Sequence, residues 1–162
     1  MIYLLDSNVF IEAMNRYYRP DICPGFWDWL STQAVSVEVY SISAVYDEIR
    51  DYDELKGWLR DNREIFIPQD DLVTVENYSS VVNHVESTPR FSRQERDKFL
   101  GKADPWLIAK AISINATIVT HEVSAPLGRK VKVPDVCGHF NVPVTDTFDL
   151  LELLGVRFVL EK

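Results

Sequence analysis

The sequence predicts an α/β sandwich built around a parallel sheet. Short apolar runs that end abruptly in polar residues are typical of buried parallel strands. Between these runs, apolar residues recur at helical spacing. Strands that alternate with helices in this way favour a sheet with crossover connections. The length of 162 residues and the hydrophobic fraction of 46% favour one domain with a single core.

In residues 1–59, two strands and three helices are expected, followed by one or two further helical turns. The strands are expected at residues 2–5 and 37–41, the helices at 9–17, 24–34 and 43–52, and the extra turns at 55–59. The first strand stops at Asp6, Pro24 suits a first helical position, and Ser43 is expected to cap the third helix.

Pro68 interrupts the chain, and five helices and four strands are expected after it. The helices are expected at residues 75–85, 92–101, 104–115 and 146–154, with a short one after residue 135, and the strands at 116–120, 131–133, 142–144 and 156–160. Ser92 and Glu95 form a capping-box pattern, and Asn115 suits a left-handed helix end. The helix at 104–115 is apolar nearly all round and is therefore expected to be central and buried.

Charge and cysteine content exclude several classes of protein. Acidic residues outnumber basic ones by 25 to 17, giving a net charge of −8, whereas a high-affinity binder of duplex DNA needs a basic face. A nucleic-acid enzyme that recruits metal cations is compatible with this charge. Cys23 and Cys137 lie far apart, which argues against a disulfide framework and a zinc ribbon. Without a membrane-length apolar run or a secretion signal, a cytoplasmic protein that does not enter a membrane is expected.

Four acidic residues stand where the predicted elements begin or end. Asp6 ends the first strand and Glu122 follows the strand at 116–120. Glu48 lies in the helix after the second strand, and Asp104 begins the buried helix. Ligands of open parallel sheets bind beyond the carboxyl ends of the strands. With right-handed crossovers, all four side chains are expected to converge there.

Several carboxylates in one cleft either raise one another's pKa values or hold a cation. Hard oxygen ligands suit Mg²⁺ or Mn²⁺, and a pair of such ions supports phosphoryl displacement by an activated water. We therefore expect Asp6, Glu48, Asp104 and Glu122 to be both metal ligands and catalytic residues.

Each of these acids also has a simpler interpretation. Asp104 suits a helix N-cap, and Glu48 a solvent-facing position. Asp6 could also cap the helix after it, and Glu122 could be an ordinary loop acid. The four together favour the metal site more than any one of them does alone.

Two basic segments flank these acids in sequence. Arg129, Lys130 and Lys132 follow Glu122 and are expected to bind RNA, whereas the bases within residues 87–103 favour a solvated helix face. His121 could contact a phosphate, although an exposed residue without a role is the preferred interpretation. The four tryptophans could stack on bases, but their helical spacing favours core packing.

Several of these segments resemble the PIN domain family in their order and spacing. They are residues 6–8 (Asp-Ser-Asn), 43–48 (Ser-Ala-Val-Tyr-Asp-Glu), 103–111 (Ala-Asp-Pro-Trp-Leu-Ile-Ala-Lys-Ala) and 117–122 (Thr-Ile-Val-Thr-His-Glu). More closely, the chain resembles the PIN-like family DUF4411. This narrower resemblance is carried by residues 17–18 (Tyr-Tyr), 26–30 (Phe-Trp-Asp-Trp-Leu) and 132–137 (Lys-Val-Pro-Asp-Val-Cys). The resemblance implies a single PIN-like domain over residues 1–162.

PIN domains are metal-dependent ribonucleases with a Rossmann-like, three-layer α/β/α sandwich and a central, mostly parallel sheet. Many are toxins of type II toxin–antitoxin systems, and many dimerise. The resemblance therefore implies single-stranded RNA as substrate, Mg²⁺ or Mn²⁺ as cofactor, and an antitoxin and a second copy as partners. Carried over, the acids are Asp6, Glu48, Asp104 and Glu122, the last standing where a typical PIN domain has Asp. Asn8 occupies the polar position that steadies the first acid.

Three functions are compatible with these residues. The first is a divalent-metal-dependent endoribonuclease, as a toxin. The second is a module that binds an antitoxin or RNA with little or no catalysis, which the longer Glu122 side chain and the net charge favour. The third, an aspartyl phosphatase with Asp6 as nucleophile, is the weakest, because Asn8 cannot act as the general acid two residues on.

Overall fold

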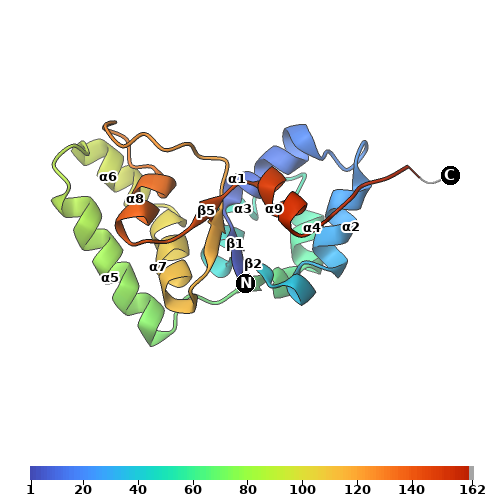
Figure 1. Cartoon of the computed structure of the whole chain (residues 1–162), viewed down its shortest axis with the longest axis horizontal. Coiled ribbons are helices and arrows are strands. Elements are labelled where there is room, and N and C mark those ends of the chain that lie inside the picture. Colours follow the sequence, from blue (N-terminus) through green and yellow to red (C-terminus); the bar gives the residue numbers. More distant parts are fainter. Residues whose placement is uncertain (161–162) are drawn as a thin grey trace.

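The computed structural model describes residues 1–160 and is organised around one sheet (Figure 1). The five strands are all parallel and lie in the order β3-β2-β1-β4-β5. They are β1 (Tyr3–Leu5), β2 (Val39–Ile42), β3 (Phe66–Ile67), β4 (Thr117–Val119) and β5 (Val144–Thr145). Helices lie on both sides of this sheet, which confirms the predicted three-layer α/β/α sandwich.

The helices follow the strands along the chain. The α-helices are α1 (Ser7–Glu12), α2 (Pro24–Thr32), α3 (Ser43–Ile49), α4 (Lys56–Asp61), α5 (Leu72–Ser87), α6 (Arg93–Leu100), α7 (Asp104–Ile114), α8 (Val133–His139) and α9 (Thr147–Leu153). A π-helical turn, η1 (Ala13–Tyr17), continues α1, and short 3₁₀ turns are η2 (Val35–Val37) and η3 (Arg63–Ile65). Every described helix is too short or too polar to span a bilayer.

The central strand, β1, pairs with β2 on one side and β4 on the other. Its three residues are buried, because helices cover both faces of the sheet. Leu5 is in register with Val119, and the Asp6 N–H donates to the Val119 carbonyl oxygen at 2.9 Å. The residues that follow β1 and β4 therefore lie side by side at the carboxyl edge.

Several expectations about the chain are confirmed. α7 is largely buried, and Asn115 ends it with a left-handed φ of 54°. The Ser92 and Asp146 side chains accept backbone N–H bonds as caps of α6 and α9. Trp27 and Trp29 belong to the core, as the preference for core packing over base stacking predicts.

The predicted strands at 131–133 and 156–160 are wrong. Val131 and Lys132 form a loop, and Val133 is the first residue of α8 because the following Pro134 favours a helix start. Residues 156–160 pair with no strand, although Phe158 packs beside Tyr18 at a ring distance of 5.8 Å. An apolar segment can bury its side chains without joining a sheet.

Two details near the second strand also differ from expectation. Ser43 is the first residue of α3 and not its cap, and its hydroxyl donates to the Ile67 carbonyl oxygen at 3.4 Å. This contact joins α3 to β3, a strand that the sequence does not predict because two residues carry no recognisable period.

Candidate functional site

Asp6 is buried at the carboxyl end of β1, and both of its carboxylate oxygens are held. Oδ1 accepts the Ser7 N–H at 2.7 Å, and Oδ2 accepts the Thr120 hydroxyl at 2.8 Å. Burial raises the pKa of Asp6 from 3.8 to about 6; the Thr120 and Ser7 bonds oppose this rise, while Glu122 and Glu48 add to it. Asp6 is the residue before α1, so it caps that helix and also faces the other acids.

Asn8 connects Asp6 to the residues after β4. Its side-chain amide donates to Asp6 Oδ2 at 3.1 Å and to the Thr120 hydroxyl at 2.9 Å. Its amide oxygen accepts the His121 N–H at 3.0 Å. These bonds fix the position of the Asp6 carboxylate relative to the segment that leads to Glu122.

Asp104 is buried at the start of α7, but it does not cap the helix. The cap position is Ala103, without a side-chain bond, and no described residue donates a hydrogen bond to the Asp104 carboxylate. The pKa of Asp104 is raised from 3.8 to about 8, mainly by burial and then by the charges of Asp6, Glu122 and Glu48. The charge of Lys102 opposes this rise. The simpler interpretation as an N-cap is therefore wrong, and the carboxylate is available to a ligand.

Glu48 and Glu122 are each tied by one oxygen to the start of a helix. Glu48 Oε2 accepts the Ala103 N–H at 2.9 Å, and Glu122 Oε2 accepts the Val133 N–H at 2.8 Å. Free amides at helix starts attract carboxylates, so both contacts are favourable. Glu48 is exposed and Glu122 half-buried, yet these hydrogen bonds hold both side chains in place. The second oxygen of each has no hydrogen-bond donor among residues 1–160.

The structure thus places the four predicted acids close enough for their charges to act on Asp6 and Asp104. They come from four places far apart in sequence: the ends of β1 and β4, helix α3 and the start of α7. The charges of the other three acids raise the pKa of Asp104. The charges of Asp6 and Glu122 also add to the rise in the pKa of the buried Cys137 thiol. This is the carboxyl edge of the sheet, where parallel folds bind ligands.

The acids at this edge suit some divalent cations and not others. Among residues 1–160, no three His, Cys, Asp or Glu side chains form a group that could hold a metal ion. A closed structural site of the zinc type is therefore not built here. Mg²⁺ usually keeps several waters and takes only one or two protein carboxylates. Asp6 and Asp104 fit that kind of ion, because both carboxylates are buried and repel each other. The Asp104 carboxylate also accepts no hydrogen bond from the described residues.

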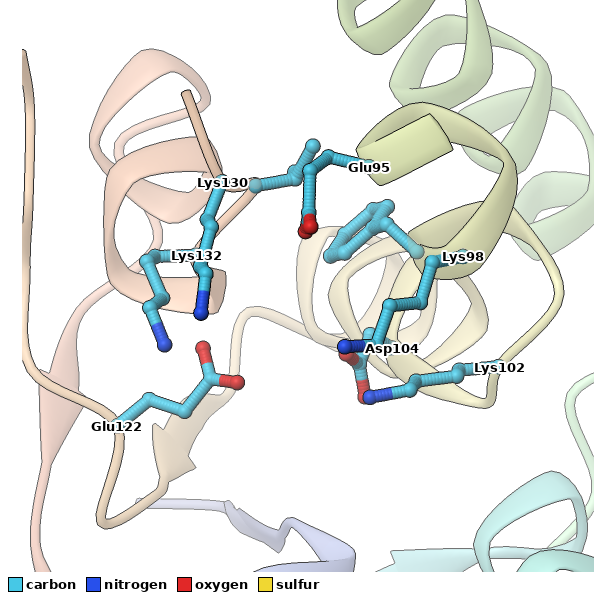
Figure 2. A pocket seen from close by; sticks show the side chains of 9 residues that line it. Glu95, Lys98, Lys102, Asp104, Glu122, Lys130 and Lys132 are labelled. Atoms are coloured by element: carbon cyan, nitrogen blue, oxygen red, sulfur yellow. The ribbon is translucent and has the colours of Figure 1, made fainter. Parts of the chain in front are cut away.

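A pocket of about 90 Å³ opens beside Asp104 and Glu122 (Figure 2). Its other lining residues are Glu95, Lys98, Phe99, Lys102, Lys130, Val131 and Lys132. Lys130 and Lys132 point toward Glu122, and Lys98 and Lys102 toward Asp104. The volume admits several waters. Acids and lysines together suit a phosphate that arrives with a cation.

The structure separates the predicted RNA-binding residues. Lys130 and Lys132 line this pocket, whereas Arg129 is exposed and not among its lining residues. Lys98 and Lys102 line it as well, although the sequence favoured a solvated face for their segment. A basic run at residues 87–103 was the available signal, but only the packing of α6 against α7 shows which of its members face the acids.

His121 is neither exposed nor isolated. Its Nε2 lies 2.9 Å from the Thr147 hydroxyl, and its ring lies 5.5 Å from that of Tyr17 and 5.6 Å from that of Phe148. Burial lowers the pKa of His121, against the charges of Asp146 and Glu12. The preferred interpretation of His121 as an exposed residue is therefore wrong.

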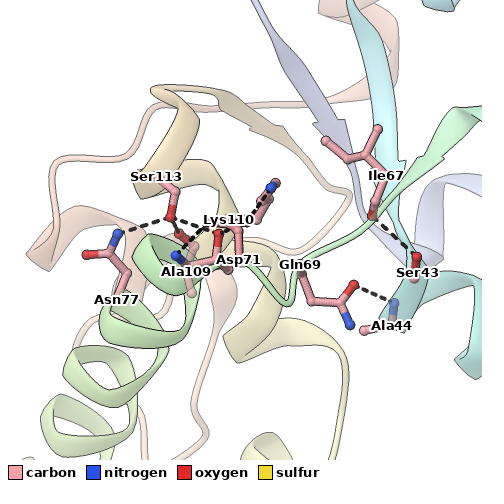
Figure 3. Close-up of polar contacts among 10 residues, drawn as sticks. Ser43, Ala44, Ile67, Gln69, Asp71, Asn77, Ala109, Lys110 and Ser113 are labelled. Carbon is pink, nitrogen blue, oxygen red and sulfur yellow. Dashed lines mark hydrogen bonds and ion pairs between the residues drawn. The ribbon is translucent and has the colours of Figure 1, made fainter.

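Helix α7, which carries Asp104, is fixed to α5 by a polar cluster (Figure 3). The buried Lys110 ammonium lies 2.7 Å from Asp71 Oδ2. The Ser113 hydroxyl lies 3.0 Å from that of Thr74 and accepts the Asn77 side-chain amide at 3.1 Å. These bonds hold the helix that presents Asp104 to the site.

Comparison with known proteins gives one match. The model of a family described as a domain of unknown function, DUF4411, matches residues 3–158. No curated protein and no solved structure matches the chain. Because the family model spans nearly all of the sequence, the chain belongs to the DUF4411 family.

Proposed function

We propose that this protein is a PIN-like, divalent-metal-dependent endoribonuclease that cleaves single-stranded RNA with a metal-activated water. One observation carries the proposal: the buried Asp104 carboxylate accepts no hydrogen bond from the described residues and is influenced by three further acids from separate elements. Lys102 offsets only part of this repulsion, so the fold is expected to gain stability from a bound cation.

Asp6 and Asp104 would hold the ion, with Glu48 and Glu122 acting on its waters. When bound, Mg²⁺ or Mn²⁺ supplies a Lewis acid and lowers the pKa of a coordinated water. Thr120, Ser7 and Asn8 orient Asp6 before any ligand arrives. The Ala103 and Val133 amides keep the two glutamates at the edges of the site.

The lysines of the pocket attract the RNA backbone to a protein whose overall charge is negative. Lys98, Lys102, Lys130 and Lys132 lie beside the acids, so phosphates meet local positive charge where the ion is held. This arrangement suits single-stranded RNA, because a local group of basic residues is enough to bind a single strand, whereas a duplex needs an extended basic face.

The biological setting proposed for this activity follows from the resemblance to PIN domains. The protein would be the toxin of a type II toxin–antitoxin system, with a cognate antitoxin protein and a second copy of the chain as partners. The molecular mass of the purified chain in solution would test for the second copy. The mass after co-expression with the product of a small neighbouring gene would test for the antitoxin.

A second candidate is a catalytically weak module that binds an antitoxin or RNA. The 2.8 Å contact between Glu122 and the Val133 N–H favours it, because that contact gives Glu122 a structural role at the start of α8. Such a module needs no divalent ion, so metal dependence distinguishes the two candidates.

The decisive test of the proposal is cleavage of labelled single-stranded RNA with Mg²⁺ or Mn²⁺ and with a chelator. Asp104→Asn should lower the rate by on the order of 100-fold or more, because it removes a ligand charge. Asp28→Asn, at an exposed position on α2, is the matched control and should cleave normally. Equal cleavage by wild type and Asp104→Asn would indicate a contaminating nuclease, and no metal-dependent cleavage at all would favour the binding module.

A further inference from the structure

Three ring side chains, two of them exposed, form a cluster that is connected to the carboxylates. Tyr17 from η1 and Phe148 from α9 meet edge to face at 5.0 Å, and His121 lies 5.5 Å from the Tyr17 ring and 5.6 Å from the Phe148 ring. We call Tyr17, His121 and Phe148 the aromatic platform. Tyr17 is 48% exposed and Phe148 44%, so roughly half of each side chain is open to solvent.

Exposure on this scale sets the platform apart from the other rings. In the described part of the chain, Tyr52 is the one further aromatic among the exposed large hydrophobic residues. The Tyr18 ring, which lies 6.4 Å from that of Phe148, is partly buried and stacks on the buried Phe26. Exposed aromatic surface that neighbours a polar site is typical of a binding surface and not of core packing.

The platform is rigidly connected to the acids. The His121 N–H donates to Asn8, which in turn donates to Asp6 Oδ2 at 3.1 Å. The His121 ring makes a second contact: its Nε2 lies 2.9 Å from the hydroxyl of the buried Thr147, the residue before Phe148 in α9. His121 and Glu122 are consecutive, and Glu122 lines the lysine-rich pocket, so the chain links the platform directly to a residue of the pocket.

Charge determines which part of a nucleotide suits each region. The pocket carries four lysines and suits a phosphate. Near the platform, the charges of Asp146 and Glu12 act on His121, and Glu12 is paired with Arg16 at 3.4 Å. The four lysines line the pocket and not the platform, so a neutral, flat group is the ligand that matches the exposed aromatic surface.

From this geometry we infer that the aromatic platform stacks on an unpaired nucleobase of the strand whose phosphate enters the lysine pocket. The inference rests on the proposed function and deepens it, because it names the part of the substrate that is recognised. Base pairing hides the faces of bases within a duplex, so the platform selects single-stranded RNA. Every base offers a flat face, so stacking alone tolerates sequence.

The test uses anisotropy of a short, labelled oligouridine that carries 2′-O-methyl groups and cannot be cleaved. An abasic strand of equal length and charge is measured beside it, both in Mg²⁺. Wild type should bind the base-bearing strand more tightly, and Phe148→Ala or Tyr17→Ala should weaken that binding by about tenfold without changing abasic binding. Phe148→Trp should restore it. Leu153→Ala, at an exposed position of the same helix, is the matched control and should change nothing.

The outcomes separate this inference from the proposed nuclease. RNA cleavage with equal binding by wild type and Phe148→Ala would overturn the platform and leave the nuclease standing. Ring-dependent binding without metal-dependent cleavage would support the platform and overturn the nuclease. If Phe148→Ala converts a dimer to a monomer and leaves oligouridine binding unchanged, the platform is an interface between copies, and the inference is overturned.

Discussion

The Thr120 hydroxyl donates a 2.8 Å hydrogen bond to Asp6 Oδ2 across a separation of 114 residues in the sequence. The two residues follow β4 and β1, which are paired in parallel. Sheet register therefore places a donor directly against the first acid of the site. The bond opposes the rise in pKa that burial causes, and so favours the charged carboxylate that a cation requires.

Replacing Thr120 should damage both the fold and the site. Thr120→Val keeps the shape but leaves a buried carboxylate without this donor, which should cost about 1–3 kcal/mol of unfolding free energy. Thr120→Ser retains the hydroxyl and should cost less. Urea unfolding of the three proteins measures the difference, and equal midpoints for wild type and Thr120→Val would contradict the role of the bond.

Asp104→Asn should stabilise the metal-free protein at alkaline pH. Because the folded-state pKa is raised from 3.8 to about 8, the stability that the neutral acid contributes is complete below about pH 4. It is lost as the pH rises through about 8. At about 1.4 kcal/mol per pKa unit, a rise of about four units corresponds to on the order of 6 kcal/mol, so the variant should gain up to that amount at high pH and little near pH 4. Thermal unfolding in a chelator across this pH range measures it, with Asp28→Asn as control; a constant difference would contradict the account.

Lysines of the pocket should govern RNA binding more than the neighbouring Arg129. Lys132→Ala should weaken binding of single-stranded RNA and reduce the slope of log K against log salt by roughly 0.7, the value for one phosphate contact in a single strand. Arg129→Ala removes the same charge from outside the pocket lining. If the two variants show the same loss and the same slope, general charge and not the pocket attracts the RNA.

The Asp71–Lys110 pair should stabilise α7 in a pH-dependent way. Bonds from Lys110 and Thr74 hold the pKa of Asp71 below its ordinary 3.8. The stability that Asp71 contributes is thus present above about pH 4 and lost as the pH falls below it. Asp71→Asn should lower the urea midpoint at pH 7, because it leaves the Lys110 ammonium buried without its partner.

Lys110→Met is the matched variant for this pair. It removes the buried charge along with the pair, so it should cost less than Asp71→Asn. A midpoint for Asp71→Asn equal to that of wild type at pH 7, with no difference in acid stability, would contradict the role given to the pair.

The fold is predictable from sequence where periodic patterns are long. α5 and α7 lie where their apolar spacing predicts, and β1 follows from an apolar run stopped by Asp6. Short segments are different, because a segment such as 131–133 can bury its two valines while it passes from a loop into the start of α8. In β3 two residues suffice for pairing, and no periodic signal can be that short.

The acids of the candidate site are also predictable, because strand ends in a parallel sheet share one edge. Asp6 and Glu122 follow from that rule. Their anchoring does not, since the bond from Val133 to Glu122 depends on the path of a loop and on a rotamer. The aromatic platform combines rings from three distant segments, and no local pattern indicates that Tyr17 and Phe148 meet.

The central claim is that Asp6 and Asp104 share a divalent ion, and an anomalous-scattering map of crystals soaked in Mn²⁺ tests it most directly. We predict a manganese peak in contact with the carboxylate oxygens of both residues, lost in crystals of Asp104→Asn. A map with no peak at the carboxyl edge of β1 and β4, or with Asp6 and Asp104 on opposite sides of the molecule, would contradict the claim.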